Sequence, residues 1–98
     1  MSRVELAPEV QDNFDRILDH LAEYEVEDLA ARITEIIQAI SILEHSPLVG
    51  RPAQNGKWEL VIGRGSHGDV ALYRYVSQVD TVFVLGLRSQ REAGYSWE

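Results

Sequence analysis

The chain of 98 residues has no cysteine and a net charge of −7, divided between −8 in residues 1–50 and +1 in residues 51–98. This length suits a single core, so we expect one domain over residues 1–98, and the lack of cysteine excludes disulfides, thiolate metal sites and a cysteine nucleophile. Because we find no apolar stretch long enough for a signal peptide or a membrane span, and no strongly basic region for phosphates, we expect a cytoplasmic protein that binds neither membranes nor, directly and strongly, nucleic acids.

The first half of the sequence predicts a short strand followed by two helices. Residues 3–6 alternate apolar and polar side chains, which is typical of a strand. Pro8 suits the first turn of a helix, because the N–H that proline lacks has no intrahelical partner there. Apolar residues then recur every three or four positions in two stretches, which predicts two amphipathic helices packed as an antiparallel hairpin. These residues are Val10, Phe14, Ile17, Leu18 and Leu21, and then Leu29, Ile33, Ile36, Ile37, Ile40 and Leu43.

The second half predicts a three-stranded antiparallel sheet. Turn-forming residues occupy much of the segment 50–56, and stretches typical of strands follow at 57–62, 69–77 and 81–87. The short link between the last two stretches fits a hairpin. We therefore expect an α+β fold, in which an N-terminal strand and an antiparallel helical hairpin precede the three strands and the helices cover one face of the sheet.

The last two strands carry apolar residues on both faces, although one helical layer can cover only one face. Successive strand residues point to opposite faces. Because large apolar patches rarely stay in water, the second face is covered either by the chain's own tail and an edge loop or by a protein partner. We favour the partner and take this open face to be the one that ends at Arg88. Strict alternation then places on it Ala71, Tyr73, Tyr75, Val82 and Val84.

No constellation in the sequence predicts a catalytic centre, a metal site or a cofactor. The segment 63–68 matches a dinucleotide-binding fingerprint in its glycine spacing, but we expect no helix after it. His20, His45 and His67 lack partners at metal-ligand spacing. Arginines and aromatics gather in the second half instead, a combination that suits a protein-binding hot spot, stacking on single-stranded RNA, or an ordinary sheet edge and tail. The residues are Arg64, Arg74, Arg88, Arg91, Tyr73, Tyr75, Tyr95 and Trp97.

Four segments of the chain carry a family pattern. Their sequences are PLVGRP at 47–52, WELVIG at 58–63, VALYR at 70–74 and LGLRSQREAGY at 85–95. In order and spacing these segments resemble the ParE-type toxins of the RelE/ParE superfamily. The resemblance implies the toxin of a bacterial type II toxin–antitoxin pair, with its antitoxin encoded beside it. Two positions depart from the pattern, since Trp58 stands where arginine is common and Ser89 where histidine is common.

The resemblance implies an activity without catalysis. ParE toxins bind DNA gyrase and poison its turnover, so we expect gyrase and a cognate antitoxin as partners and no cofactor. The RelE branch cleaves messenger RNA on the ribosome, but of its pattern only Arg88 and, loosely, Tyr95 carry over, and its middle-strand arginine falls near Ala71. A RelE-like endoribonuclease and an attenuated toxin that only binds its antitoxin are the alternatives.

Two sets of site residues follow from this interpretation. The antitoxin is expected along the helical hairpin and the open sheet face, where the binding residues would be Ala71, Tyr73, Tyr75, Val82 and Val84. The target is expected to meet the arginines and the aromatic tail. The expected target-binding residues are Arg88, Arg91, Tyr95 and Trp97, followed by Arg51, Arg64 and Arg74.

Overall fold

The computed structural model describes residues 1–24, 29–63 and 68–89. The chain begins with a strand and two helices and continues with four strands, two of them joined to the next by single 3₁₀ turns at Gln54–Gly56 and Ser77–Val79. The elements are β1 (Arg3–Leu6), α1 (Pro8–Tyr24), α2 (Leu29–Ile42), β2 (Arg51–Pro52), β3 (Trp58–Ile62), β4 (Asp69–Val76) and β5 (Thr81–Ser89).

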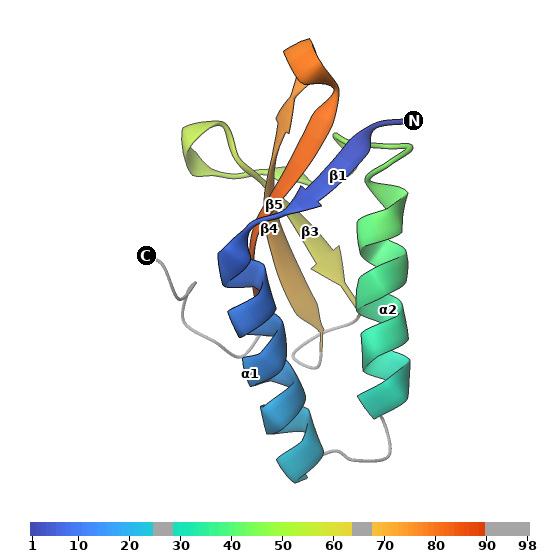
Figure 1. Cartoon of the computed structure of the whole chain (residues 1–98), viewed down its shortest axis with the longest axis vertical. Helices are drawn as coiled ribbons and strands as arrows, with labels where there is room; N and C mark the ends of the chain where they lie inside the picture. Colours follow the sequence, from blue (N-terminus) through green and yellow to red (C-terminus); the bar gives the residue numbers. More distant parts are fainter. Residues whose placement is uncertain (25–28, 64–67, 90–98) are drawn as a thin grey trace.

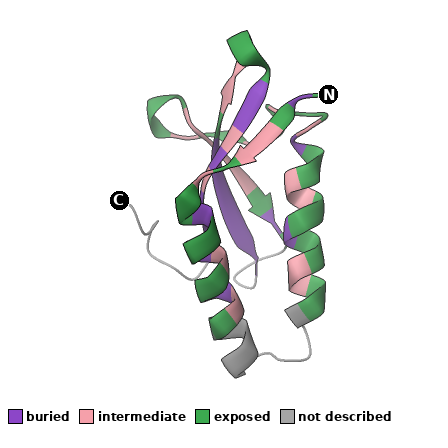
Figure 2. Cartoon of the chain, in the orientation of Figure 1, coloured by how far each residue is buried: buried purple, intermediate pink, exposed green. Residues whose placement is uncertain are grey.

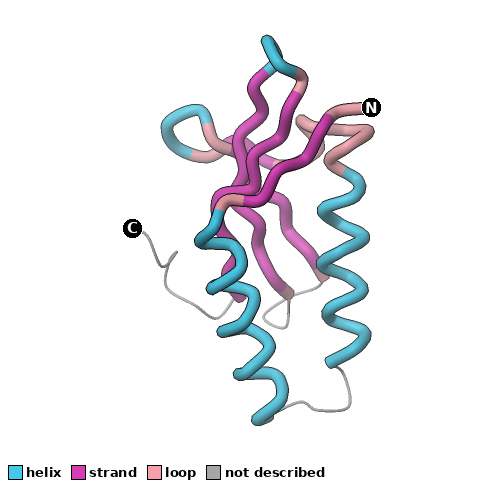
Figure 3. Tube along the Cα trace, in the orientation of Figure 1, coloured by secondary structure: helices cyan, strands magenta, loops and turns pink. Residues whose placement is uncertain are grey.

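All five strands form one sheet in the order β1-β5-β4-β3-β2 (Figure 3). The α+β class and the three long antiparallel strands are confirmed. The sheet also contains β1 and β2, one at each edge. The N-terminal strand β1 pairs with β5 in parallel, and both helices and three strands lie between them along the chain. The short strand β2 lies in the segment that we predicted as turns, and it pairs with the first two residues of β3.

The two helices run antiparallel along one face of the sheet (Figure 1). Helix α1 packs over β5 and α2 over β3. Their apolar stripes meet the sheet, and Figure 2 shows buried residues along β4, β5 and the helix surfaces turned toward them. The core contains Val10, Ile17, Ile36 and Leu43 from the helices and Ile62, Ala71, Tyr73, Val82, Val84 and Leu87 from the strands. Neither described helix is long and apolar enough to span a membrane.

The sequence-based assignment of the open sheet face is wrong. Ala71, Tyr73, Val82 and Val84 are fully buried between the sheet and the helices, and Tyr75 packs against the same core. The open face is therefore the opposite one, which we call the distal face. Its residues alternate with those of the core along β3, β4 and β5. It includes Glu59, Val61, Val70, Leu72, Arg74, Leu85 and Arg88.

A β-bulge in β5 explains why strict alternation wrongly grouped Arg88 with Val84 on one face. Leu72 pairs with Gly86 but Tyr73 pairs with Val84, so Leu85 is an extra residue in β5. A bulge of one residue reverses the alternation after it. Leu87 consequently joins the core on the same face as Val84, and Arg88 emerges on the distal face.

Asn13 ties α1 to this bulge. Its side chain is fully buried, and its Oδ1 accepts a hydrogen bond from the backbone N–H of Leu87 at 3.0 Å. A buried N–H without an acceptor costs about 1–3 kcal/mol. The contact therefore favours the bulged path of the strand and fixes α1 next to the residue that precedes Arg88.

The N-terminus is held against the tip of the β4–β5 hairpin. Asp80 Oδ1 accepts hydrogen bonds from Ser2 Oγ at 2.6 Å and from Tyr75 Oη at 2.7 Å. These donors favour the charged carboxylate, so they lower the pKa of Asp80, and the same carboxylate raises the pKa of Tyr75. Edge strand β1 is thereby anchored at its start.

Candidate functional site

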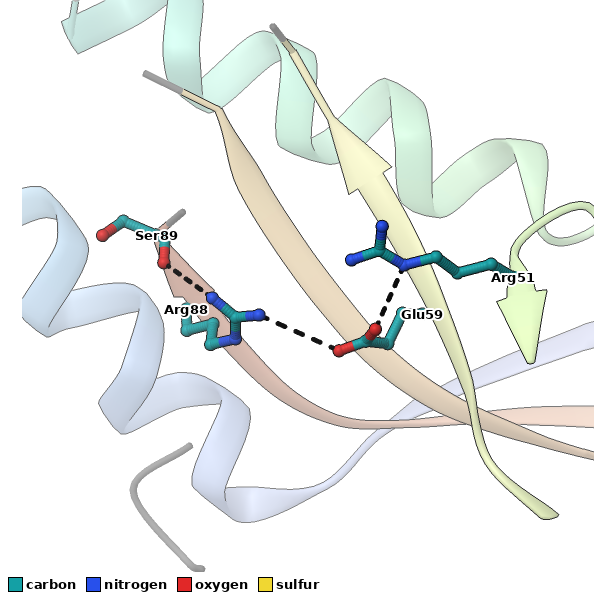
Figure 4. Close-up of polar contacts among 4 residues, drawn as sticks. All are labelled: Arg51, Glu59, Arg88 and Ser89. Carbon is teal, nitrogen blue, oxygen red and sulfur yellow. Dashed lines mark hydrogen bonds and ion pairs between the residues drawn. The ribbon is translucent and has the colours of Figure 1, made fainter. Parts of the chain in front are cut away.

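The distal face carries a cluster of three charged side chains from three strands (Figure 4). Arg51 comes from β2, Glu59 from β3 and Arg88 from the end of β5. The Nε of Arg51 donates to Oε1 of Glu59 at 3.2 Å, and Nη2 of Arg88 lies 3.9 Å from Oε2 of the same carboxylate. One carboxylate thus faces two guanidinium groups, and the cluster has an excess of one positive charge.

Arg88 is the least exposed of the described arginines on this face. Its side chain is 17% exposed, and its Nη1 donates to the backbone carbonyl of Ser89 at 3.3 Å. The contact with Glu59 is longer than a hydrogen bond, so its attraction is mainly Coulombic. Arg88 therefore lies along the surface of the sheet beside Glu59 and does not extend into solvent.

Gly50 positions Arg51. Its N–H donates to the hydroxyl of Tyr73 at 3.0 Å, and a Cβ at this position would overlap the backbone carbonyl of Glu59. Glycine thus lets the chain approach β3 closely enough for β2 to pair with it. Burial raises the pKa of the Tyr73 hydroxyl, and its hydrogen bond with Gly50 acts in the opposite direction.

Apolar residues border the charged cluster. Val70 and Leu72 are buried on the distal face, with Ala53 and Leu85 packed against them. Part of this face is thus covered by the loop after β2, which is the edge-loop alternative in the sequence analysis. Val61 stays 42% exposed on β3, two residues from Glu59. The surface combines arginines with an exposed aliphatic side chain.

Of the three predicted target-binding residues that the structure describes, it brings together Arg51 and Arg88. Arg74 lies exposed on the same face, near the hairpin tip and opposite Phe83. The predicted residues Arg64, Arg91, Tyr95 and Trp97 lie outside the described residues.

Glu59 is the residue that sequence reasoning missed. Its place between Trp58 and Leu60, which pack against the core, puts its side chain on the distal face, and this alternation was the available signal. Of the two departures from the family pattern, Trp58 has a structural role, since it packs against the core opposite Tyr73. At Ser89 the contact with Arg88 is made by the backbone carbonyl, which any residue would provide.

A second feature is an apolar groove between α1 and α2. Its volume is about 380 Å³, and Ile37 on its rim is 55% exposed. The groove lies on the helical side of the molecule, whereas the charged cluster lies on the distal face. The residues that line it include Leu6, Val10 and Phe14, then Ile36, Ile37, Ile40 and Leu87.

Comparison with known proteins identifies the family. The model of the ParE toxin of type II toxin–antitoxin systems, parDE, matches residues 4–94. This chain belongs to the ParE toxin family. Membership makes it a toxin component of a type II toxin–antitoxin system. No curated protein sequence matches it.

Two solved structures have the fold of this ParE-family chain. A chain of the chromosomal ParDE toxin–antitoxin system from P. aeruginosa is similar with a TM-score of 0.75 and 18% identity, over 91% of this chain and 96% of that chain. A chain of the RelBE2 toxin–antitoxin complex from Mycobacterium tuberculosis is similar with a TM-score of 0.58 and 22% identity, over 90% of this chain and 96% of that chain. At these low identities, the comparison establishes a shared fold and nothing further.

Proposed function

We propose that this ParE-family toxin inhibits DNA gyrase by binding to it through the distal face, without catalysing a reaction. The observation that carries the proposal is the meeting of Arg51 and Arg88 around Glu59, beside the exposed Val61. Arginines next to apolar surface have the composition of protein-binding hot spots. Gyrase is the target that the family resemblance implies.

The described part of the distal face favours binding over RNA cleavage. Near the cluster its middle strand contributes Val70 and Leu72, which are buried and apolar, whereas Arg74 of that strand lies near the hairpin tip. The carboxylate of Glu59 lies between the two arginines, so it repels a phosphodiester and offsets part of their positive charge. Cleavage requires stabilisation of the negative charge that develops in its transition state, and this arrangement weakens such stabilisation.

We also propose that a cognate antitoxin binds in the groove between α1 and α2. The groove is apolar, and its rim residue Ile37 is more than half exposed in the isolated chain. An amphipathic helix would bury this surface in the way that helix-in-groove complexes do. The antitoxin would therefore occupy the helical side while the target meets the distal face.

Inhibition of DNA supercoiling by purified gyrase tests the target. We expect Arg88→Ala to weaken inhibition about thirtyfold, because truncation of a hot-spot arginine costs about 2 kcal/mol or more. Arg51→Ala, at a more exposed position, should also weaken it. The control is Arg3→Ala, which removes an arginine from an exposed Arg–Glu pair at the other edge of the sheet and should leave inhibition unchanged.

A parallel reaction with translating ribosomes tests the alternatives. Cleavage of messenger RNA at codon positions, lost in the Arg88→Ala variant, would contradict the proposal and assign the chain to the endoribonuclease branch. A chain that binds its antitoxin but affects neither gyrase nor translation would overturn the proposed target and indicate an attenuated toxin. Thermal melting of each variant checks that the fold is intact.

A further inference from the structure

Two different kinds of contact join the three charged side chains of the distal face. Glu59 contacts Arg51 through a single hydrogen bond to Nε, and it lies beyond hydrogen-bond distance from Arg88. Figure 4 shows this contact running from Nε of Arg51 to the carboxylate of Glu59. A guanidinium binds a carboxylate most strongly through two parallel N–H donors, and neither described contact with Glu59 has that form.

We propose that Arg51 and Arg88 together form a binding site for an acidic side chain of a protein partner. The incoming carboxylate binds between the two guanidinium groups and replaces Glu59 as their common acceptor. This inference rests on the proposed protein-binding role of the distal face, and it names the chemistry that the face recognises.

The geometry makes this exchange feasible. The side chain of Arg51 is 57% exposed, so it can turn toward an incoming group without disturbing the core. Arg88 is closely packed and 17% exposed, so it provides a fixed donor at the other side. Glu59 itself is 18% exposed, and its half-buried carboxylate keeps both arginines close to the surface before a partner arrives.

Charge and surroundings favour a carboxylate of a protein over a nucleic acid. Nucleic-acid affinity grows with the number of phosphates that a protein neutralises. Here one excess positive charge lies on a chain of net charge −7, which suits a single acidic side chain better than a polyanion. The exposed Val61 and the apolar residues Ala53 and Leu85 suit the aliphatic neighbours of such a side chain in a protein.

Glu59 has a defined role in this proposal. Its carboxylate competes with the incoming one, so it limits binding to groups that can offer better hydrogen bonds to the two arginines. Glu59→Gln removes the competing charge and keeps the shape. We therefore expect this variant to bind an acidic peptide about threefold to fivefold more tightly, which corresponds to the loss of one exposed ion pair.

Direct titration tests the site without gyrase or antitoxin. The probes are an acetylated tetrapeptide amide, Leu-Glu-Asp-Leu, its Leu-Gln-Asn-Leu counterpart, and a ribo-oligonucleotide with the same charge as the acidic peptide. The Nε–H signals of Arg51 and Arg88 in nitrogen-15 NMR spectra of the full chain report binding. The matched control for Glu59→Gln is Glu5→Gln, which makes the same change of charge in the Arg3–Glu5 pair on β1.

The expected result is that the acidic peptide shifts both arginine signals, that its affinity rises in the Glu59→Gln variant, and that Glu5→Gln has no such effect. Loss of the peptide-induced shift of the Arg88 signal in Arg51→Ala, with unchanged melting temperature, completes the assignment. Equal effects of the two peptides, tighter binding of the oligonucleotide, or weaker peptide binding in the Glu59→Gln variant would each overturn the proposal. A toxin that fails to inhibit gyrase but binds the acidic peptide would separate this inference from the proposed target.

Discussion

Gly50 shows how one residue without a side chain determines the geometry of the charged cluster. A Cβ at this position would overlap the carbonyl oxygen of Glu59 and lie 2.8 Å from the hydroxyl of Tyr73. The first neighbour is backbone, which cannot move without shifting β3. The pairing of Arg51 with Glu59 therefore depends on glycine at the preceding position.

We expect Gly50→Ala to lower the free energy of unfolding by about 1–3 kcal/mol, as overpacking of a close contact does. The urea midpoint of the purified chain measures this loss. Adding Tyr73→Phe should not restore stability, because the overlap with the carbonyl of Glu59 remains and the N–H of Gly50 loses its acceptor. A Gly50→Ala variant as stable as the unmodified chain would show that β2 can separate from β3 at little cost.

The site residues show which information the sequence contained. Arg51 and Arg88 were predictable as target-binding candidates from residue type and family pattern, whereas their meeting around Glu59 depends on pairing between strands that are distant in the chain. The isolated Gly86 within a strand pattern was a signal of the bulge. Strict alternation ignored it and consequently placed Arg88 on the same face as Val84.

Among the elements, α2 and β4 are connected by an ion pair at their buried ends. Arg32 Nη2 lies 2.7 Å from Asp69 Oδ2, with side chains that are 12% and 1% exposed. Burying two charges is costly, and their attraction repays the cost only when both partners are present. The pair is therefore weak evidence of net stability, but removing one of its partners is costly.

Substitution of Arg32 should show how much the loss of this buried ion pair destabilises the fold. We expect Arg32→Met to lower the free energy of unfolding by about 3–5 kcal/mol, because the buried carboxylate of Asp69 loses its ion pair with Arg32. Arg3→Met, in a pair whose side chains are 75% and 44% exposed, should change it by less than about 1 kcal/mol. Urea unfolding of both variants makes the comparison, and similar losses in the two would show that the Arg32–Asp69 pair behaves as a surface pair.

The helices and long strands were predictable because each has a period of its own in the sequence. Apolar spacing of three and four predicted α1 and α2, and the long stretches at 57–62, 69–77 and 81–87 predicted β3, β4 and β5. Local pattern could not predict that β1 pairs in parallel with β5, because the two strands lie more than seventy residues apart in the chain. It also could not predict β2, whose two residues pair only because Gly50 permits a close approach.

At the scale of the whole molecule, the two proposed binding surfaces lie on opposite sides of the sheet. The apolar groove belongs to the helical layer, and the arginine cluster belongs to the distal face. They approach each other at β5, where Leu87 lines the groove and the next residue, Arg88, belongs to the cluster. This separation predicts that binding of the antitoxin and binding of the target can be impaired independently by single substitutions.

Ile37 and Ile42 provide a matched test of the groove, since both lie on α2 and are 55% and 50% exposed, but only Ile37 is among the groove-lining residues. We expect Ile37→Asp to weaken binding of the proposed cognate antitoxin by about thirtyfold, because it puts a charge into the apolar lining of the groove. Ile42→Asp adds the same charge to the same helix and should change the affinity by less than about threefold, as peripheral positions do. Calorimetric titration measures both affinities, and circular dichroism confirms that each variant keeps its helices. Inhibition of gyrase should be unchanged in both variants. Arg88→Ala should weaken inhibition of gyrase and leave binding of the antitoxin unchanged. Equal losses of antitoxin binding at the two isoleucines would place the antitoxin outside the groove.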